Sequence, residues 1–356
     1  MGTLSIRKRL ALEIARKMRN NLKELHPLRQ LFWECTQRCN LHCKHCGSDC
    51  KRMSTIKDMP AEDFLRVIDS ITPHVNPNVV SIVITGGEPL MREDLEEVGL
   101  ALYRRGYPWG IVSNGLYLTQ ERLQRLMRAG LHSITISLDG LSEDHNWLRG
   151  HPESYNRAMD AIKRLVHEPE LAWDVVTCVN RRNYPYLDEL KASLYKIGVR
   201  NWRLFTIFPV GRATQYPEFQ LTDEEFTGVL DFIKRIRKEG KMRVNYCCEG
   251  FLGNYEGEVR DNFFSCNAGL SVGSILADGS ISACPSIRSD FHQGNIYQDD
   301  FMDVWEHRFQ SFRNREWMKE GACADCDFFR YCEGNGMHLR DDEGKLLFCH
   351  LKRLQS

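Results

Sequence analysis

The chain has 356 residues, which is more than one ordinary domain usually needs and suggests two units or one α/β barrel with an appendage. Its 42% hydrophobic and 27% charged residues are typical of a globular chain with a sizeable core, so intrinsic disorder as the main state is excluded. Because 48 basic and 48 acidic residues cancel, the net charge gives no argument for a nucleic-acid partner. No apolar run is long enough to span a membrane and the charged start lacks the apolar region of a secretory signal, so we expect a cytoplasmic protein without an integral membrane span.

The first predicted element is a basic amphipathic helix over residues 5–25. Leu10, Ile14, Met18 and Leu22 recur at every fourth position, and the other faces are mostly basic. We expect this leucine stripe to pack on the next domain. A helix that lies on a membrane surface is the alternative.

Residues 31–212 alternate short apolar runs with amphipathic segments. The predicted strands span residues 31–35, 79–85, 110–113, 133–138, 174–179 and 202–208. The clearest predicted helices between them span residues 61–72, 119–129, 155–167 and 186–197. This alternation predicts an α/β fold with a parallel sheet, and six units would build a partial barrel. In such sheets the loops after the carboxyl ends of the strands carry the chemistry.

After residue 212 the pattern changes. A bridging helix is predicted over residues 223–239, and a cysteine- and glycine-rich region with few periodic segments follows. The predicted division of the chain is 1–28 for the basic helix, 29–225 for the barrel, 226–260 for the bridge and linker, and 261–356 for a cysteine-rich domain.

The fourteen cysteines are too few and too spread for a small disulfide scaffold, and they cluster. In a chain without a signal peptide, clustered cysteines are more often metal ligands than disulfides. Cys39, Cys43 and Cys46 directly follow the first predicted strand and can reach one metal site from a single loop. A zinc ion would require a fourth ligand, which His42 or His45 could supply. Iron–sulfur clusters are normally held by four thiolates, so a three-thiolate loop would leave one iron open, as in a catalytic site.

Two further cysteines, Cys35 and Cys50, flank this loop, and we interpret both as spare or packing residues. The ends of the later strands add glycines and polar side chains. The motifs are Gly86-Gly87-Glu88-Pro89, Ser113-Asn114-Gly115, Ser137-Leu138-Asp139-Gly140 followed by Arg149, and Val210-Gly211-Arg212. Each motif is weak alone, but together they place polar groups at one rim of the barrel, beside the three-cysteine loop.

With these motifs, residues 29–212 resemble a radical S-adenosylmethionine (radical SAM) enzyme. Cys39, Cys43 and Cys46 match the defining motif of that family, and residues 86–89 match its GGEP element. The resemblance implies a [4Fe–4S] cluster whose free iron takes the amino and carboxylate groups of S-adenosylmethionine. It also implies reductive cleavage of that cofactor, after which a 5′-deoxyadenosyl radical removes a hydrogen atom from the substrate.

The resemblance also implies roles for the polar rim. The GGEP backbone with Glu88 would recognise the amino group of the cofactor. The other contacts would be Ser137 and Arg149 to its carboxylate, Ser113, Asn114 and Asp139 to the sugar, and Val210 and Gly211 to the adenine.

The C-terminal cysteines form a second pattern. Cys266 and Cys284 enclose Gly279, and Cys323, Cys326, Cys332 and Cys349 follow. The pattern resembles the SPASM extension of radical enzymes that modify peptides, in which seven motif cysteines occur. Six of the seven match, and the seventh would fall at Gly336. A zinc ribbon built from the last four cysteines is the alternative.

The resemblance implies two auxiliary iron–sulfur clusters. The outer one would be held by Cys323, Cys326, Cys332 and Cys349. The inner one would use Cys266, Cys284 and an upstream cysteine, for which we favour Cys248. Its form stays open among a three-thiolate [4Fe–4S] cluster, a [2Fe–2S] centre that uses both Cys247 and Cys248, and a site completed by His338 or another nitrogen or oxygen group.

The expected activity is a radical modification of a peptide or protein substrate, such as a cross-link, an epimerisation or an oxidation. Formylglycine formation is disfavoured, because Cys284 is followed by Pro285-Ser286-Ile287, whereas sulfatase-maturing relatives carry an acid there. A flavodoxin- or ferredoxin-type protein is the expected electron donor. The alternatives are modification of a small metabolite and a non-catalytic iron–sulfur electron carrier or redox sensor.

Overall fold

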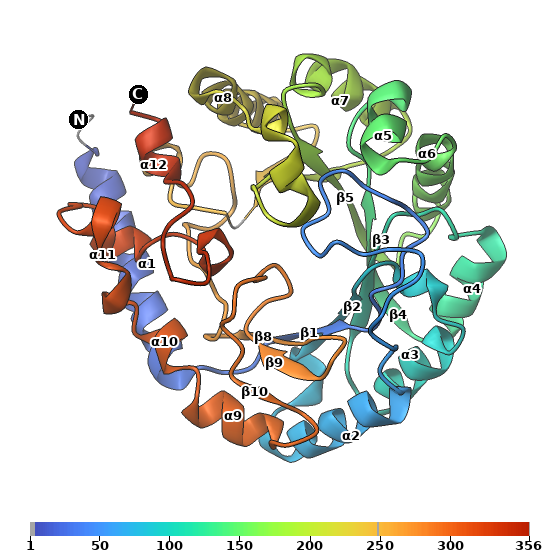
Figure 1. Ribbon diagram of the computed structural model, residues 1–356. Coiled ribbons are helices and arrows are strands. Elements are labelled where there is room, and N and C mark those ends of the chain that lie inside the picture. Colours follow the sequence, from blue (N-terminus) through green and yellow to red (C-terminus); the bar gives the residue numbers. More distant parts are fainter. Residues whose placement is uncertain (1–3, 248, 356) are drawn as a thin grey trace.

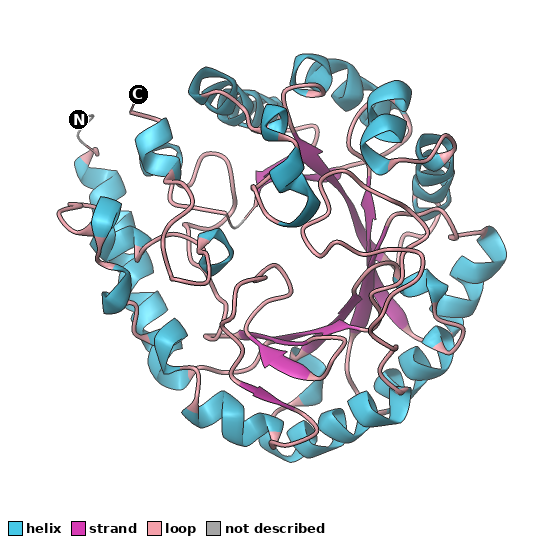
Figure 2. Cartoon of the chain, viewed as in Figure 1, coloured by secondary structure: helices cyan, strands magenta, loops and turns pink. Residues whose placement is uncertain are grey.

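The structure, a computed structural model, describes residues 4–247 and 249–355. Its strands form one ten-stranded sheet in the order β10-β9-β8-β1-β2-β3-β4-β5-β6-β7. Helices surround the outer side of the curved sheet, and long loops cover its mouth (Figures 1 and 2). No helix among the described residues is long and apolar enough to cross a membrane.

The six predicted strands of the barrel are confirmed, and each is parallel to its neighbour. They are β1 (Gln30–Glu34), β2 (Ser81–Thr85), β3 (Trp109–Ser113), β4 (Leu131–Ser137), β5 (Ala172–Val179) and β6 (Asn201–Thr206). In β2, Ile82 and Ile84 are buried and alternate with half-buried neighbours, as the two-residue period of a strand requires. The parallel order brings all six carboxyl ends to one rim.

The helices between the strands pack against the outer side of the sheet (Figure 1), two of them through large aromatic rings. They are α2 (Ala61–Ile71), α3 (Leu95–Arg104), α4 (Gln120–Arg128), α5 (Ser142–Arg149), α6 (Ser154–Leu165) and α7 (Leu187–Lys196). Trp33 of β1 stacks on Phe64 of α2, with ring centroids 4.2 Å apart. A Cβ on Gly99 of α3 would lie 2.2 Å from the ring of Trp109, so this glycine makes room for the indole of β3.

The C-terminal region continues the same sheet at both edges. The predicted bridging helix is confirmed as α8 (Asp223–Glu239), which begins with a capping box between Thr222 and Glu225. β7 (Arg243–Tyr246) pairs with β6, and β8 (Val272–Ile275) pairs with β1, both in parallel. The hairpin partners β9 (Ser280–Ser282) and β10 (Gly294–Asn295) follow, and the remaining helices are α9 (Phe301–His307), α10 (Gln310–Arg313), α11 (Phe329–Cys332) and α12 (His350–Arg353).

The predicted packing of the N-terminal helix, α1 (Ile6–Leu25), is wrong. Leu10, Ile14 and Met18 are 62%, 62% and 64% exposed, so the leucine stripe faces away from the protein. The basic face packs inward instead, and Arg19 donates a 2.6 Å hydrogen bond to the carbonyl of Tyr331. The physical reason is that the carbonyls at the end of α11 are free acceptors, which attract cations. The membrane-surface alternative for this helix stays a prediction.

Candidate active site

The three-cysteine loop follows β1 and is held by the tip of β2. Gly87 N–H donates to the carbonyl of Thr36 at 2.7 Å, and Glu88 N–H donates to the carbonyl of Arg38 at 2.9 Å. A Cβ on Gly86 would lie 2.2 Å from the Thr36 carbonyl, and one on Gly87 would lie 2.1 Å from the Arg38 carbonyl. The two glycines are therefore required for this close approach of two main chains.

The carboxylate of Glu88 ties β2 to β3. It is buried and accepts hydrogen bonds from the Ser113 hydroxyl and Asn114 N–H, both at 2.8 Å, and from Leu90 N–H at 3.1 Å. Burial raises the pKa of Glu88, and the three donors oppose that effect. Both carboxylate oxygens therefore accept hydrogen bonds from the protein itself, Oε1 from two donors and Oε2 from one.

The thiols of the loop lie together in a small apolar cluster. Cys39 and Cys43 are 8% exposed, Cys46 is half-buried, and Cys50 and Leu41 complete the cluster. Burial and the neighbouring Cys43 raise the pKa of Cys39 to about 12, whereas a hydrogen bond from Cys50 lowers the pKa of Cys46 to about 5.

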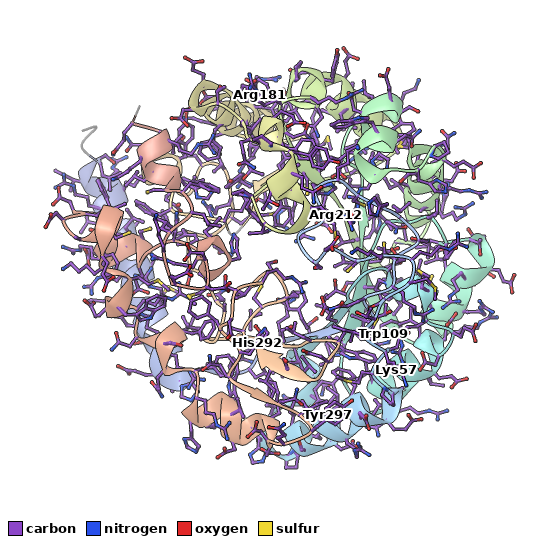
Figure 3. All side chains as sticks on the ribbon, in the orientation of Figure 1. Lys57, Trp109, Arg181, Arg212, His292 and Tyr297 are labelled. Carbon is purple, nitrogen blue, oxygen red and sulfur yellow. The ribbon has the colours of Figure 1, made fainter. Side chains whose placement is uncertain are left out.

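Arg212, labelled in Figure 3, organises the same loop from the end of β6. Its guanidinium donates to the carbonyl of Cys43 at 2.8 Å, and to the carbonyl of Cys50 and the carboxylate of Asp49 at 2.9 Å each. The main-chain N–H of Arg212 also donates to the carbonyl of Cys46 at 3.0 Å. The sequence analysis placed Arg212 in the rim motif at residues 210–212 but gave it no role of its own.

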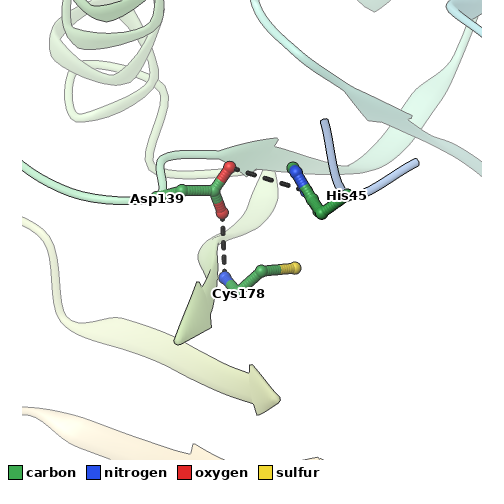
Figure 4. Close-up of side chains that lie close together, drawn as sticks. All are labelled: His45, Asp139 and Cys178. Carbon is green, nitrogen blue, oxygen red and sulfur yellow. Dashed lines mark hydrogen bonds and ion pairs between the residues drawn. The ribbon is translucent and has the colours of Figure 1, made fainter. Parts of the chain in front are cut away.

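A buried ion pair faces the loop from β4 and α5. Arg149 donates a 2.5 Å hydrogen bond to Asp139, and its guanidinium lies 3.7 Å from Cys43 Sγ. The second oxygen of Asp139 accepts from Cys178 N–H at 2.8 Å, and His45 Nε2 lies 3.8 Å from the carboxylate (Figure 4). Burial opposes ionisation of Asp139, but Arg149 outweighs it, and the pKa of Asp139 is lowered. The Arg149 side of the pair therefore places a positive charge beside the Cys43 sulfur.

The structure brings the predicted cofactor-binding residues to one rim. They are Gly86, Gly87, Glu88, Pro89, Ser113, Asn114, Ser137, Asp139, Arg149, Val210 and Gly211. Asn114 Nδ2 lies 4.0 Å from Cys39 Sγ, and Ser137 is the half-buried last residue of β4. A Cβ on Gly211 would lie 2.4 Å from the carbonyl of Gly47, so the segment after β6 also closes directly on the loop.

A second cysteine site lies in the C-terminal region. Cys323, Cys326, Cys332 and Cys349 line one cavity of about 310 Å³. Burial raises the pKa of Cys323, and a hydrogen bond from Arg340 opposes the shift.

The structure describes only some of the cysteines predicted for the inner site. Cys266 is half-buried, and its thiol has a lowered pKa, because Arg315 and the N–H of Met337 outweigh burial. Cys284 follows β9, and Cys247 is buried just after β7. The favoured upstream ligand, Cys248, lies outside the described residues.

The sequence analysis missed a buried acid beside this site. Glu249 is 1% exposed and accepts from the Thr206 N–H at 2.7 Å, the Thr206 hydroxyl at 2.6 Å and the Tyr246 hydroxyl. His350 Nε2 lies 3.7 Å from the same carboxylate. Only the adjacency of Glu249 to the Cys247–Cys248 pair, and of His350 to Cys349, pointed to these residues in the sequence.

The chain matches two family models. The Radical SAM superfamily model matches residues 33–190, and the SPASM model, an iron–sulfur cluster-binding domain, matches residues 266–327. The matched segments contain the three-cysteine loop and, in the C-terminal region, Cys266, Cys284, Cys323 and Cys326.

Characterised proteins resemble the chain over most of its length. The AdoMet-dependent heme synthase of Oleidesulfovibrio alaskensis is 28% identical over 340 residues, covering 88% of this chain and 86% of the relative. The mycofactocin maturase MftC of Mycolicibacterium smegmatis is 29% identical over 313 residues, covering 86% and 77%.

Two solved structures share the fold. SuiB of Streptococcus suis bound to S-adenosylmethionine superposes with a TM-score of 0.68 at 19% identity, covering 94% of this chain and 79% of SuiB. The structure of anSMEcpe with bound AdoMet gives a TM-score of 0.71 at 17% identity, covering 92% and 94%. The solved structures show the shared fold, and the two family models show that the chain belongs to the radical SAM superfamily and carries a SPASM domain, which imply a [4Fe–4S] cluster, S-adenosylmethionine and auxiliary iron–sulfur clusters as its cofactors.

Proposed function

We propose that Cys39, Cys43 and Cys46 hold the [4Fe–4S] cluster of this radical SAM enzyme and leave one iron for the cofactor. When bound, the cluster and S-adenosylmethionine would supply the radical chemistry that removes a hydrogen atom from the substrate. The observation that carries the proposal is the single loop with three buried or half-buried thiols, bound through its main chain to residues 86–88.

The surrounding residues orient this site and exclude water from it. Arg149 places its guanidinium 3.7 Å from Cys43 Sγ, and Asn114 places its amide 4.0 Å from Cys39 Sγ. Both groups stabilise negative charge on the thiolates, which tunes the electrostatics of a bound cluster. Ser137, Val210 and Gly211 complete the rim on which the cofactor would lie.

The test is an anaerobic assay with reconstituted protein, S-adenosylmethionine and a reductant, in which 5′-deoxyadenosine is measured. Cys39→Ala, Cys43→Ala and Cys46→Ala should each abolish the product. Cys35→Ala is the matched control, because Cys35 is also buried near the loop but lies outside the motif. A wild-type protein that forms no 5′-deoxyadenosine would instead indicate an electron carrier.

We further propose that Cys323, Cys326, Cys332 and Cys349 hold the outer auxiliary cluster, and that Cys266 and Cys284 belong to the inner one. Three four-iron clusters correspond to about twelve irons per chain, and a two-iron inner centre would give about ten. Iron near four per chain together with one equivalent of zinc would contradict the auxiliary clusters. The proposed division into a barrel over 29–225 and an auxiliary domain over 261–356 follows the same ligand sets.

The proposed substrate is a peptide or a protein segment, and the proposed reaction is its radical modification. Three relatives support this class: the maturase MftC, SuiB bound to the precursor peptide SuiA, and anSMEcpe bound to the Cp18Cys peptide. A flavodoxin- or ferredoxin-type protein would deliver the electron.

A small molecule is the second candidate substrate, because curated heme synthases match 85% or more of this chain. The two classes can be separated with lysate of the source cells grown in deuterated medium and split by size. Deuterium transferred to 5′-deoxyadenosine from the macromolecular fraction, and lost after protease treatment, would support a peptide or protein. Transfer from the low-molecular-weight fraction alone would support the small molecule.

A further inference from the structure

The position at which the seventh SPASM cysteine is missing is filled by an imidazole ring. A Cβ on Gly336 would lie 2.6 Å from Cε1 and 2.9 Å from Nδ1 of His338. Gly336 has φ −70° and ψ 140°, a conformation open to any residue, so the backbone does not require glycine here. The glycine instead makes room for the ring of His338, which folds back over it.

This turn is bound directly to Cys266. The Cys266 thiol accepts a hydrogen bond from the N–H of Met337, the residue between Gly336 and His338. Arg315 strengthens the connection, because its guanidinium donates to the carbonyl of Cys266 at 3.1 Å and to the carbonyl of Asn335 at 3.4 Å. The imidazole therefore belongs to the same small region as the first inner-cluster cysteine.

His338 also carries an unused ligand atom. The residue is 8% exposed, and its Nε2 is buried without a hydrogen-bond partner among the described residues. Leaving such a buried polar atom unpaired destabilises the folded state, so these atoms are rare unless a partner is added later. Phe208 packs on the ring with centroids 4.7 Å apart, which limits the positions open to the imidazole.

We propose that Nε2 of His338 is a ligand of the inner auxiliary cluster and stands in for the thiolate that position 336 lacks. Imidazole is a suitable ligand for iron, and histidines replace cysteines on one iron of Rieske-type clusters. This inference rests on the proposed inner site at Cys266 and Cys284. It distinguishes a nitrogen-ligated cluster from one with an open iron.

The test is pulsed EPR of the reduced, full-length, cluster-loaded protein without S-adenosylmethionine, prepared with ¹⁵N-labelled histidine. A ligating imidazole produces a strong nitrogen hyperfine coupling, which should change from the ¹⁴N to the ¹⁵N pattern on labelling and disappear in His338→Ala. His292→Ala is the control and should keep the coupling, because His292 is exposed.

A second variant covers the case in which His338→Ala does not fold. Gly336→Cys combined with His338→Ala returns a thiol to the SPASM position, with a small shift of the Glu249 carbonyl, which would lie 2.9 Å from the new Cβ. This variant should keep the wild-type iron content and lose the nitrogen coupling.

Two results would overturn the inference and are distinguishable by iron content. Wild-type iron near ten or twelve per chain without a histidine coupling would refute His338 as a ligand and leave the proposed clusters standing. Iron near eight, with Mössbauer spectra of only two four-iron clusters, would refute the inner site itself and His338 with it.

Discussion

Replacing Glu88 by glutamine tests whether its carboxylate holds the rim together or contacts the cofactor. One carboxylate oxygen accepts from Leu90 N–H and the Ser113 hydroxyl, and the other accepts from Asn114 N–H. A glutamine side chain has one amide oxygen, and an NH₂ group replaces the second carboxylate oxygen. The least costly arrangement keeps the oxygen that faces Leu90 and Ser113 and turns the NH₂ group toward Asn114. The hydrogen bond from Asn114 N–H is then lost, and that N–H is left unpaired.

The expected cost is about 2 kcal/mol, because one hydrogen bond to a charged acceptor is lost and a buried donor is left unpaired. With an unfolding entropy of about 2.1 cal/mol/K per residue, a chain of 356 residues has about 0.7 kcal/mol/K in total. The same change therefore lowers the midpoint of thermal unfolding by about 3 °C.

The assay is thermal denaturation of anaerobic protein without S-adenosylmethionine, followed by titration with the cofactor. Glu88→Gln should lower the midpoint before any cofactor is added, whereas Glu93→Gln, at an exposed neighbouring position, should not. An unchanged midpoint together with tenfold weaker cofactor binding would refute the reasoning, because the carboxylate would then act on the ligand and not on β3.

Three further predictions address other parts of the structure. Arg212→Lys should lower the iron retained after gel filtration, since an ammonium cannot replace the guanidinium that bridges three acceptors of the loop; unchanged iron would contradict this role. Leu12→Ala should lower the free energy of unfolding, measured with denaturant, by about 2–5 kcal/mol, and Leu10→Ala by less than about 0.5 kcal/mol, because only Leu12 is buried. A larger effect of Leu10→Ala would show that the face of α1 with Leu10 packs on the protein. Burial, reinforced by Arg149, lowers the pKa of His145 to about 3, so below about pH 6.5 the unfolded chain binds a proton that the folded chain does not. The free energy of unfolding should therefore fall by about 2 kcal/mol between pH 6.5 and pH 5.0 because of His145. In urea unfolding, His145→Asn should lose that much less stability over this range than the wild type, and an identical pH dependence in both proteins would refute the prediction.

The sequence predicted the barrel well because its signals are local. Each of β1 to β6 has an apolar run bounded by polar residues, and α8 has an N-terminal capping box and ends before Gly240 in the left-handed conformation. The sheet edges were not predictable in this way. β7 and β8 are four residues long, and β8 pairs with β1, which is more than 230 residues earlier in the chain.

The contacts within the site were not predictable for the same reason, because they join residues that lie far apart in the sequence. The motif around Glu88 identified the residues of the rim, but only the fold shows that the carboxylate is engaged by Ser113 and Asn114. Periodicity in α1 showed which side chains share a face and not which face is buried, because the acceptors that attract Arg19 lie about 310 residues away. The sequence left His338 as one of several alternatives at the inner site, and only the fold shows that its ring lies over Gly336.

The most direct measurement is electron–nuclear double resonance on the reduced first cluster, with S-adenosylmethionine labelled with ¹⁵N at its amino group and ¹⁷O at its carboxylate. Binding should alter the EPR spectrum and introduce hyperfine couplings from both labels, and Cys50→Ala should give the same result. A spectrum that does not respond to the cofactor, or that responds only once Cys50 is removed, would show that a fourth protein ligand occupies the iron and would contradict the account.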